Sequence, residues 1–232
     1  TATSIEDAGN GWRRCSMTST ATAGARTFRI YALEADNDRS YLGDGSTEDI
    51  YIWGAQVEAG SFPTSYIKSN SGSTTTRSAD VASIPVADFG WNNGAGTVVA
   101  EVDTADASNF GILWSANADS FQNRTLASVG NDLIYMYNRK NNGTEVNDPY
   151  ANAPLDNTPL KHGYAFTDGD FNHTLNGGAV ETVASNEMPV GINSFDIGNR
   201  LYTSGGHLNG HIKKLMYIPR RVTNAQLISL TE

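Results

Sequence analysis

The sequence consists mainly of short segments in which apolar and polar residues alternate, and helical periodicity is almost absent. The segments are separated by glycine, asparagine, aspartate or proline, the residues that favour turns. Tight turns are indicated at Asn142-Gly143, Asn176-Gly177 and Asn209-Gly210, because glycine adopts positive φ at little cost. We therefore predict an all-β protein, with strands over residues 12–21, 27–32, 50–58, 81–84, 96–104, 109–116, 124–129, 132–138, 162–167, 171–175, 178–183, 194–197 and 210–218.

One helix is predicted, close to the end of the chain. Thr223 is a residue type that caps helices, and an apolar stripe of Ala225, Leu227, Ile228 and Leu230 follows it.

Charge and hydropathy argue against two classes of partner. The formal net charge is −9, and the densest basic stretches, Lys213–Lys214 and Arg220–Arg221, are too short for a nucleic-acid footprint. No apolar run approaches the length of a membrane span, so we expect neither nucleic-acid binding nor membrane insertion. Cys15 is the single cysteine, so an intramolecular disulfide is impossible, and we expect it to be an unreactive strand residue.

The stretch SNSGSTTTRSAD, residues 69–80, is polar and without periodicity, and we predict that it is a linker. Residues 1–68 contain too few predicted strands to close a sandwich alone. Residues 81–232 are numerous enough for a complete β-sandwich. The chain begins at Thr1 rather than at methionine, and we expect it to be a piece of a longer protein.

The sequence on either side of the linker resembles a junction found in phage tail-fibre, tail-spike and other virion proteins. The resemblance lies in YIWGAQVEAGSFPTSYIKS, residues 51–69, in TRSADVASI, residues 76–84, and upstream in DAGNGWRRCSMTSTATAG, residues 7–24. In those proteins the end of a carbohydrate-binding-module-like jelly roll passes into a lectin-like domain. The resemblance implies that residues 1–68 are the C-terminal part of such a jelly roll. Alternation places Tyr51 and Trp53 on one strand face, and we expect that face to be buried in the jelly roll, with upstream sequence, the lectin-like domain or another subunit as its cover.

The C-terminal half is similar to a concanavalin A-like lectin/glucanase domain of the laminin-G type. The similarity rests on DFNHTLNGGAVETVA, residues 170–184, which we interpret as a hairpin, and on residues 197–230, where a long strand is followed by Pro219 and the capped helix. In the long strand, alternation places His211, Lys213 and Leu215 on the same face as Tyr217. The resemblance implies a jelly-roll β-sandwich over residues 81–232.

The run EVDTAD, residues 101–106, poses the question of catalysis, since paired carboxylates cleave glycosidic bonds in many glycosidases. Laminarinase-like glycosidases of the same fold use a bulged E-x-D-x-x-E run. Here the third acid is the shorter Asp106, and the run lies in what we expect to be an opening rather than a central strand. We therefore interpret Glu101 and Asp103 as a solvated strand face. A glycoside hydrolase or polysaccharide lyase using Glu101, Asp103 and Asp106 is the alternative.

Metal binding is the next possibility. The four histidines, His162, His173, His207 and His211, lack the convergent spacing of a zinc site, and we interpret them as surface or hydrogen-bonded residues. We expect no cofactor. Calcium is the alternative, with Asp103, Asp106 and Asn109 as its ligands, because lectin-like sandwiches often hold calcium with loop oxygens.

Sugar binding requires an aromatic ring for the apolar face of a sugar, and amides, carboxylates or arginine for its hydroxyls. The stretch NDLIYMYNRKNNG, residues 131–143, offers both kinds of group. The candidate ligand-binding residues are Tyr135, Tyr137, Asn138 and Arg139, with Trp91 and Trp114 as further platforms; the alternative for each aromatic residue is a place in the core.

Together these observations predict a non-catalytic virion surface protein, a fibre, spike or decoration component that lies outside the host cell and binds glycans. Its other expected partners are virion subunits, and the resemblance favours a homo-oligomer, with a trimer as first choice. A purely structural assembly module that binds no sugar is a further alternative, because one fold hosts many functions.

Overall fold

The computed structural model describes residues 2–20, 27, 29–31, 45, 50–60, 62–70, 73–104, 107–141, 143, 146–150, 159–183, 187–200 and 205–232. The chain divides into two compact units, Thr1–Arg77 and Ser78–Glu232. This division falls inside the segment 69–80 that we predicted to be a linker. The assignment of residues 1–68 to the end of a jelly roll stays a prediction.

The first unit contains an antiparallel ribbon of β1 (Ala2–Gly9) and β2 (Trp12–Thr18). The strand β1 was not predicted from the sequence, although Asn10 and Gly11, which have positive φ, form a turn typical of hairpins. The segment 50–58 was predicted to be a strand and is not one in the structure, because it has no ladder partner among the described residues and Gly54 turns at φ 69°.

Tyr51 and Trp53 are not buried within the first unit, and what covers their aromatic face stays a prediction. Tyr51 and Trp53 are 76% and 72% exposed, and the Trp53 ring lies against the half-exposed Tyr66, with the ring centroids 4.6 Å apart. None of the described residues of this unit is fully buried. A ribbon of two strands provides too little surface to form a core.

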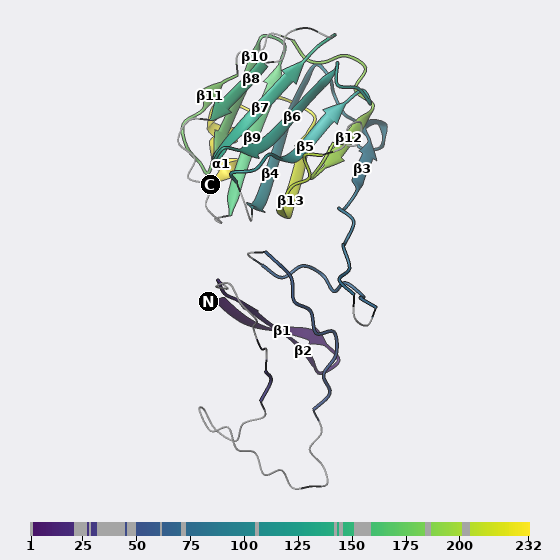
Figure 1. Ribbon diagram of the computed structural model, residues 1–232. Helices are drawn as coiled ribbons and strands as arrows, with labels where there is room; N and C mark the ends of the chain where they lie inside the picture. Colours follow the sequence, from purple (N-terminus) through teal and green to yellow (C-terminus); the bar gives the residue numbers. More distant parts are fainter. Residues whose placement is uncertain are drawn as a thin grey trace. The chain divides into compact units, whose positions relative to one another are not determined.

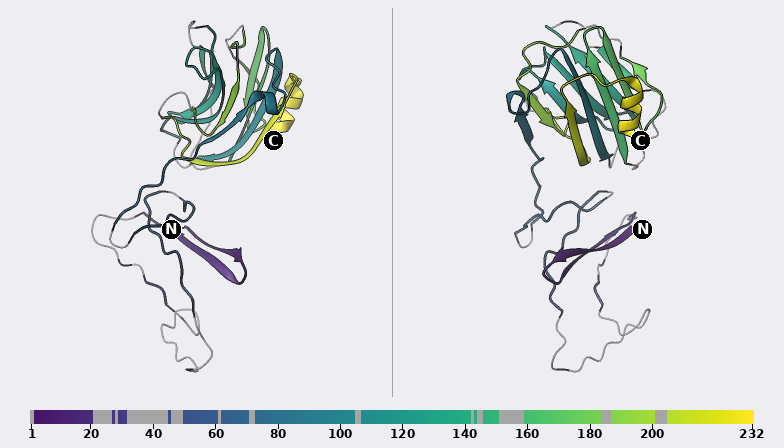
Figure 2. Two further views of the ribbon diagram at one scale, coloured as in Figure 1. Left: turned by 90° about the vertical axis from the view of Figure 1, so that its right-hand side faces the viewer. Right: turned by 180° about the vertical axis from the view of Figure 1, so that it is seen from behind.

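The second unit is a sandwich of two antiparallel sheets (Figures 1 and 2). The first sheet has the order β11-β10-β9-β4-β13, and the second has the order β3-β12-β5-β6-β7-β8. The strands are β3 (Ala82–Pro85), β4 (Ala95–Thr104), β5 (Gly111–Asn117), β6 (Arg124–Gly130), β7 (Leu133–Arg139), β8 (Val146–Tyr150), β9 (Leu160–Thr167), β10 (Asp170–Leu175), β11 (Glu181–Thr182), β12 (Ser194–Ile197) and β13 (Gly210–Ile218). A short 3₁₀ turn, η1 (Val86–Asp88), follows β3. All were predicted at least in part except β8 and η1, and the all-β prediction is confirmed.

The core lies between the sheets because alternate residues of each strand point inward. On β4 these are Val98, Ala100 and Val102, and all three are fully buried. From the second sheet, Trp114 stacks on Phe195 with their rings 5.7 Å apart and nearly parallel. Burial of such rings supplies much of the hydrophobic stabilisation of a sandwich.

The strand β13 contains a β-bulge, and the predicted assignment of its side chains to the two faces of the sheet was wrong on one side of that bulge. The register shifts between Ile212 and Lys214, so Ile212 joins Leu215 and Tyr217 on the core side. Lys213 is the extra residue, and its exposed side chain forms an ion pair with Asp103. One inserted residue reverses the alternation on one side of a bulge.

The helix α1 (Asn224–Thr231) begins where the sequence predicts it. The side chain of Thr223 accepts a hydrogen bond from Gln226 N, and the side chain of Gln226 accepts one from Thr223 N, which completes a capping box. The helix covers the outer side of β9 and β10 (Figure 2), where the buried Leu227 contacts Ala165. Among the described residues no helix is long and apolar enough to cross a membrane.

Candidate functional site

The face of β6 and β7 that is turned away from the core cluster carries an array of polar and aromatic side chains. In cross-strand register, Arg139 pairs with Arg124, and Tyr135 pairs with Ser128. Paired residues lie on the same face of a sheet. Tyr135 and Tyr137 are both half-buried, and their ring centroids are 6.0 Å apart. The array therefore joins two tyrosine rings to two guanidinium groups on one surface.

Two phenylalanines from outside these strands complete the array. Phe110 precedes β5, and its ring meets that of Tyr137 edge-on at 6.2 Å. Phe121 lies between β5 and β6. Phe110 is 41% exposed and Phe121 is 38% exposed, so both rings present an apolar surface to solvent.

Three arginines surround the ring of Phe121. The guanidinium carbon of Arg124 lies 3.5 Å from the ring centroid, that of Arg139 lies 5.1 Å away, and that of Arg200 lies 5.6 Å away. Arg200 is also 5.4 Å from the ring centroid of Phe110. Cation–π contact holds each guanidinium near the ring. We call the set of Phe110, Phe121, Arg124, Arg139, Arg200, Tyr135 and Tyr137 the arginine–aromatic face.

Neighbouring loops fix the position of Phe121. Arg124 Nη1 donates to the carbonyl of Phe121 at 3.5 Å, so the same arginine that stacks on the ring also contacts its backbone. The amide oxygen of Asn123 accepts hydrogen bonds from Asn141 N at 2.9 Å and from Val190 N at 3.4 Å. These contacts tie the loop between β5 and β6 to two other loops, which preorganises the face.

The three arginines differ in access to solvent. Arg124 is 2% exposed, and its stacking on Phe121 indicates a supporting role. Arg139 and Arg200 are half-buried, so each side chain keeps partial contact with solvent. Among the described residues, the buried Nε of Arg200 has no hydrogen-bond partner. The face therefore combines two half-buried arginines with two exposed rings, and this combination suits an anionic ligand that also has an apolar side.

The structure brings three of the predicted sugar-binding residues together. Tyr135, Tyr137 and Arg139 all lie on the arginine–aromatic face. Asn138 lies on the opposite side of β7, where it is 2% exposed and donates to the hydroxyl of Tyr164 at 3.3 Å. Because side chains alternate along a strand, Asn138 and Arg139 cannot share a face. The assignment of Asn138 to the site is therefore corrected.

Both predicted tryptophan platforms belong to the core. Trp114 is fully buried, so a ligand cannot reach it. Trp91 is partly buried and stacks on Tyr217 with ring centroids 4.9 Å apart. Both assignments are corrected, since each side chain serves the packing of the sandwich.

The acidic residues of β4 lie on the other sheet, on its outer face. Glu101 pairs in register with Lys214 on β13 and with Lys161 on β9. Asp103 forms an ion pair with Lys213 at 3.3 Å. The strand is interior to its sheet, contrary to the prediction, although it comes early in the sequence. Pairing of each acid with lysines is typical of a solvated strand face.

Asp106, the third acid of the run, lies outside the described residues, so neither the catalytic alternative nor the calcium alternative is tested in full. Asn109 is exposed, and Asp103 has the ammonium group of Lys213 as its neighbour, which is unfavourable for a calcium ligand. Within the described part of the chain, no group of three or more histidine, cysteine or acidic side chains is placed to hold a metal ion.

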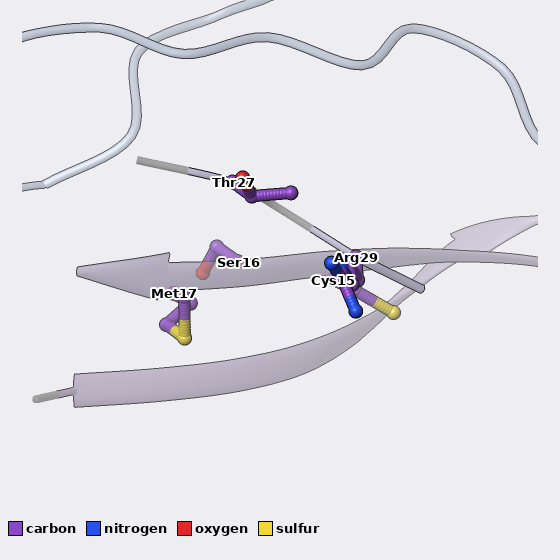
Figure 3. A pocket seen from close by; sticks show the side chains of 5 residues that line it. All are labelled: Cys15, Ser16, Met17, Thr27 and Arg29. Atoms are coloured by element: carbon purple, nitrogen blue, oxygen red, sulfur yellow. The ribbon is translucent and has the colours of Figure 1, made fainter. Parts of the chain in front are cut away.

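The first unit has a shallow hollow of about 430 Å³ beside β2 (Figure 3). Cys15, Ser16, Met17, Thr27 and Arg29 line it. Cys15 is a strand residue, as predicted, and it is exposed. We assign no role to this hollow, because its lining brings no converging polar groups.

Sequence reasoning missed four members of the arginine–aromatic face: Phe110, Phe121, Arg124 and Arg200. Phe121 and Arg124 lie only three residues apart in the stretch SFQNR, and an aromatic residue within a polar loop was the available signal. Arg200 lies about sixty residues further along the chain than Arg139, and no local pattern connects the two.

In comparisons of sequence, no protein-family model and no curated protein matches the chain. Comparison of structures finds the carbohydrate-binding module CBM40 of the Ruminococcus gnavus IT-sialidase. The module bound to α2,6-sialyllactose matches with a TM-score of 0.54 and 14% identity, over 68% of this chain and 96% of the module. Bound to α2,3-sialyllactose, it matches with a TM-score of 0.52 and 16% identity, over 63% and 87%.

The sandwich has the concanavalin A-like jelly-roll fold. Domains LG4-5 of the mouse laminin α1 chain also match, with a TM-score of 0.50 and 8% identity, over 63% of this chain and 41% of that one. The prediction of fold class is confirmed by these likenesses. At such low identities they show the fold alone.

Proposed function

We propose that the chain is a non-catalytic module that binds acidic glycans at the arginine–aromatic face. The observation that carries this proposal is the convergence of Arg124, Arg139 and Arg200 on the exposed ring of Phe121, with Arg200 also close to the exposed ring of Phe110. A cluster of guanidinium groups offers positive charge and hydrogen-bond donors to an anion. The chain as a whole has a formal net charge of −9, so this positive cluster is opposite in sign to the net charge of the protein.

The chemistry of an acidic sugar matches this face. A guanidinium group forms paired hydrogen bonds with a carboxylate or sulfate, while an aromatic ring packs against the C–H groups of the sugar ring. The similarity in fold to a module that binds sialyllactose supports the proposal. We propose that catalysis is absent, since Glu101 and Asp103 lie on the other sheet beside lysines.

We also propose a biological setting for this module. The resemblance of residues 51–69 and 76–84 to virion junctions leads us to propose a subunit of a virion surface fibre, spike or decoration, outside the cell. The exposed aromatic side chains of the first unit favour assembly with other subunits, and a homotrimer is our first choice. Several weak sites in one assembly bind a glycan-coated surface more strongly than one site alone.

The test of binding uses calorimetry with 3′-sialyllactose, 6′-sialyllactose, a sulfated glycan and neutral lactose. We expect the acidic ligands to bind and lactose to bind at least about tenfold more weakly, because lactose offers no anion to the arginines. Arg139→Gln and Arg200→Gln should each weaken binding by about tenfold or more. The matched control is Lys214→Gln, which removes one positive charge from the other sheet and should leave binding unchanged.

This assignment would be contradicted if lactose bound as tightly as the acidic ligands. It would also be contradicted if Arg200→Gln and Lys214→Gln lost the same affinity for the acidic ligands. Thermal unfolding of each variant identifies a loss caused by misfolding. Release of cleaved sugar from any of the ligands, abolished by Glu101→Gln, would restore the enzyme alternative.

A further inference from the structure

Two histidines form a buried pair inside the sandwich, away from the arginine–aromatic face. His162 lies on β9 and His173 on β10, and both side chains are 0% exposed. His162 Nε2 and His173 Nδ1 are 3.4 Å apart, within reach of one hydrogen bond. The outer nitrogens, His162 Nδ1 and His173 Nε2, have no hydrogen-bond partner among the described residues. An imidazole in such a place is stable only without charge.

The pair lies where the two sheets meet at one edge. Tyr150 of β8 packs edge-on against the ring of His173, with ring centroids 5.3 Å apart and planes at 87°. The hydroxyl of Tyr150 donates to the carbonyl of Ala179 at 2.8 Å. Tyr150 therefore joins β8 of one sheet to β10 and to the turn before β11 of the other.

Two carboxylates and two tyrosines of the described residues lie near His173. Glu181 of β11 places its carboxylate 3.9 Å from His173 Nε2, and Asp148 of β8 favours a proton on His173. On β9 the register partner of His173 is Tyr164, and on β4 that of His162 is the uncharged Ala100. A first proton on His173 is thus partly compensated, whereas among the described residues the charged group that acts on His162 is His173 itself.

Burial sets the protonation behaviour of both rings. Burial lowers the pKa of His162 well below its ordinary value, and the nearby His173 acts in the same direction. Burial lowers the pKa of His173 to about 4, although Asp148 acts against this effect. In the unfolded chain both rings bind protons near pH 6.5. The unfolded or opened state therefore binds more protons between about pH 6.5 and pH 4, and stability falls as the pH falls through this window.

The strand β8 connects the histidine pair to the candidate site. Tyr150 and Asp148 pair in register with Ile134 and Met136 of β7, two buried residues on the core side. Pro149, between them, pairs with Tyr135 of the arginine–aromatic face. A displacement of β8 that relieves the charged histidines therefore removes the strand that flanks Tyr135.

We propose that the His162–His173 pair is an acid-sensitive switch that keeps the β8 edge closed at neutral pH and opens it in acid, with weaker glycan binding as the consequence. The closed and open states differ in the contact of Tyr150 with His173. The effect on glycan binding rests on the proposed function, whereas the opening of the edge does not.

The first test follows the edge in the intact, unliganded wild-type chain. Hydrogen exchange is measured by mass spectrometry at about pH 7 and pH 5 and corrected for the intrinsic effect of pH on exchange. We expect exchange in β8 to increase in acid relative to exchange in β6, by about tenfold. An unchanged ratio would overturn the proposal, and this test needs no variant.

The second test replaces the pair. In the double variant His162→Phe/His173→Phe neither ring can be charged, and His173→Gln serves if the double variant does not fold. We expect the melting temperature of the wild type to fall from about pH 7 to pH 5 and that of either variant to fall much less. The control His211→Gln removes an exposed histidine on β13 and should retain the wild-type pH dependence. Equal pH dependence in wild type and pair variants would overturn the switch.

The third test measures the affinity for 3′-sialyllactose at the same two pH values, at which the ligand carboxylate stays ionised. We expect the wild type to lose about tenfold in affinity in acid and the pair variant to lose little. Binding that is present but equal at both pH values would overturn the link to the site. Absence of binding at about pH 7 would instead contradict the proposed function, while the exchange experiment still decides whether the edge opens.

Discussion

At the scale of single residues, the decisive property is which side of a strand a side chain takes. Asn138 and Arg139 are neighbours in the sequence, yet Asn138 contacts Tyr164 in the core while Arg139 approaches Phe121 on the surface. Among the aromatic residues, burial separates Trp114 of β5 from Phe110, which precedes that strand. Trp114 is fully buried, and Phe110 is 41% exposed.

This contrast predicts different effects of truncation. Trp114→Ala should lower the free energy of unfolding by about 3–5 kcal/mol, because it leaves a cavity beside Phe195. Phe110→Ala should cost less than about 1.5 kcal/mol, since its ring is already in contact with water, and should weaken binding of acidic glycans. Urea unfolding of both variants measures the difference. Similar losses in the two would show that the face is part of the core.

At the scale of elements, the helix α1 could be predicted from neighbouring residues, whereas the strand β8 depends on its place in the sheet. The helix α1 begins at a threonine whose capping role depends only on residues within one turn. The strand β8 was missed because its sequence, VNDPY, contains Pro149, and proline argues against a strand unless the strand lies at an edge. The structure places β8 at the edge of its sheet, where this proline is tolerated.

The cap of α1 provides the prediction at this scale. Thr223→Ala should lower the free energy of unfolding by about 1 kcal/mol, because Gln226 N loses its acceptor. Thr223→Ser keeps the hydroxyl oxygen and should recover most of that loss. Chemical denaturation of the three proteins side by side measures both effects. A Thr223→Ser variant as unstable as Thr223→Ala would assign the contribution to the methyl group rather than to the cap.

At the scale of the whole molecule, the two units differ in how their apolar residues are used. The second unit buries a continuous core between its sheets. In the first unit Tyr51, Trp53 and Val57 are all more than two-thirds exposed, at 76%, 72% and 91%. Apolar side chains in such numbers are rarely left in water, and their exposure is typical of a surface that another chain or segment covers.

The prediction at this scale concerns independent folding. Residues 78–232 expressed alone should unfold in one cooperative transition and retain binding of acidic glycans, because both the core and the arginine–aromatic face lie within them. Residues 1–77 alone should show no cooperative transition. Circular dichroism during heating, with light scattering for the mass of the full chain, measures both. A cooperative transition in monomeric residues 1–77 would show that this segment folds without another chain or segment over its apolar side chains.

The amino-acid sequence by itself determined most strands of the sandwich, the turn at Asn176-Gly177, the cap of α1 and the acidic character of the chain. These properties depend on neighbouring residues, so a short window of sequence contains the information. Tertiary structure alone decided that a bulge at Lys213 turns Ile212 toward the core, that His162 and His173 form a buried pair, and that Arg200 joins Arg124 and Arg139 at Phe121. Each of these results joins residues far apart in the chain, and their meeting depends on the order and register of strands within the sheets, which alternation along one strand does not specify.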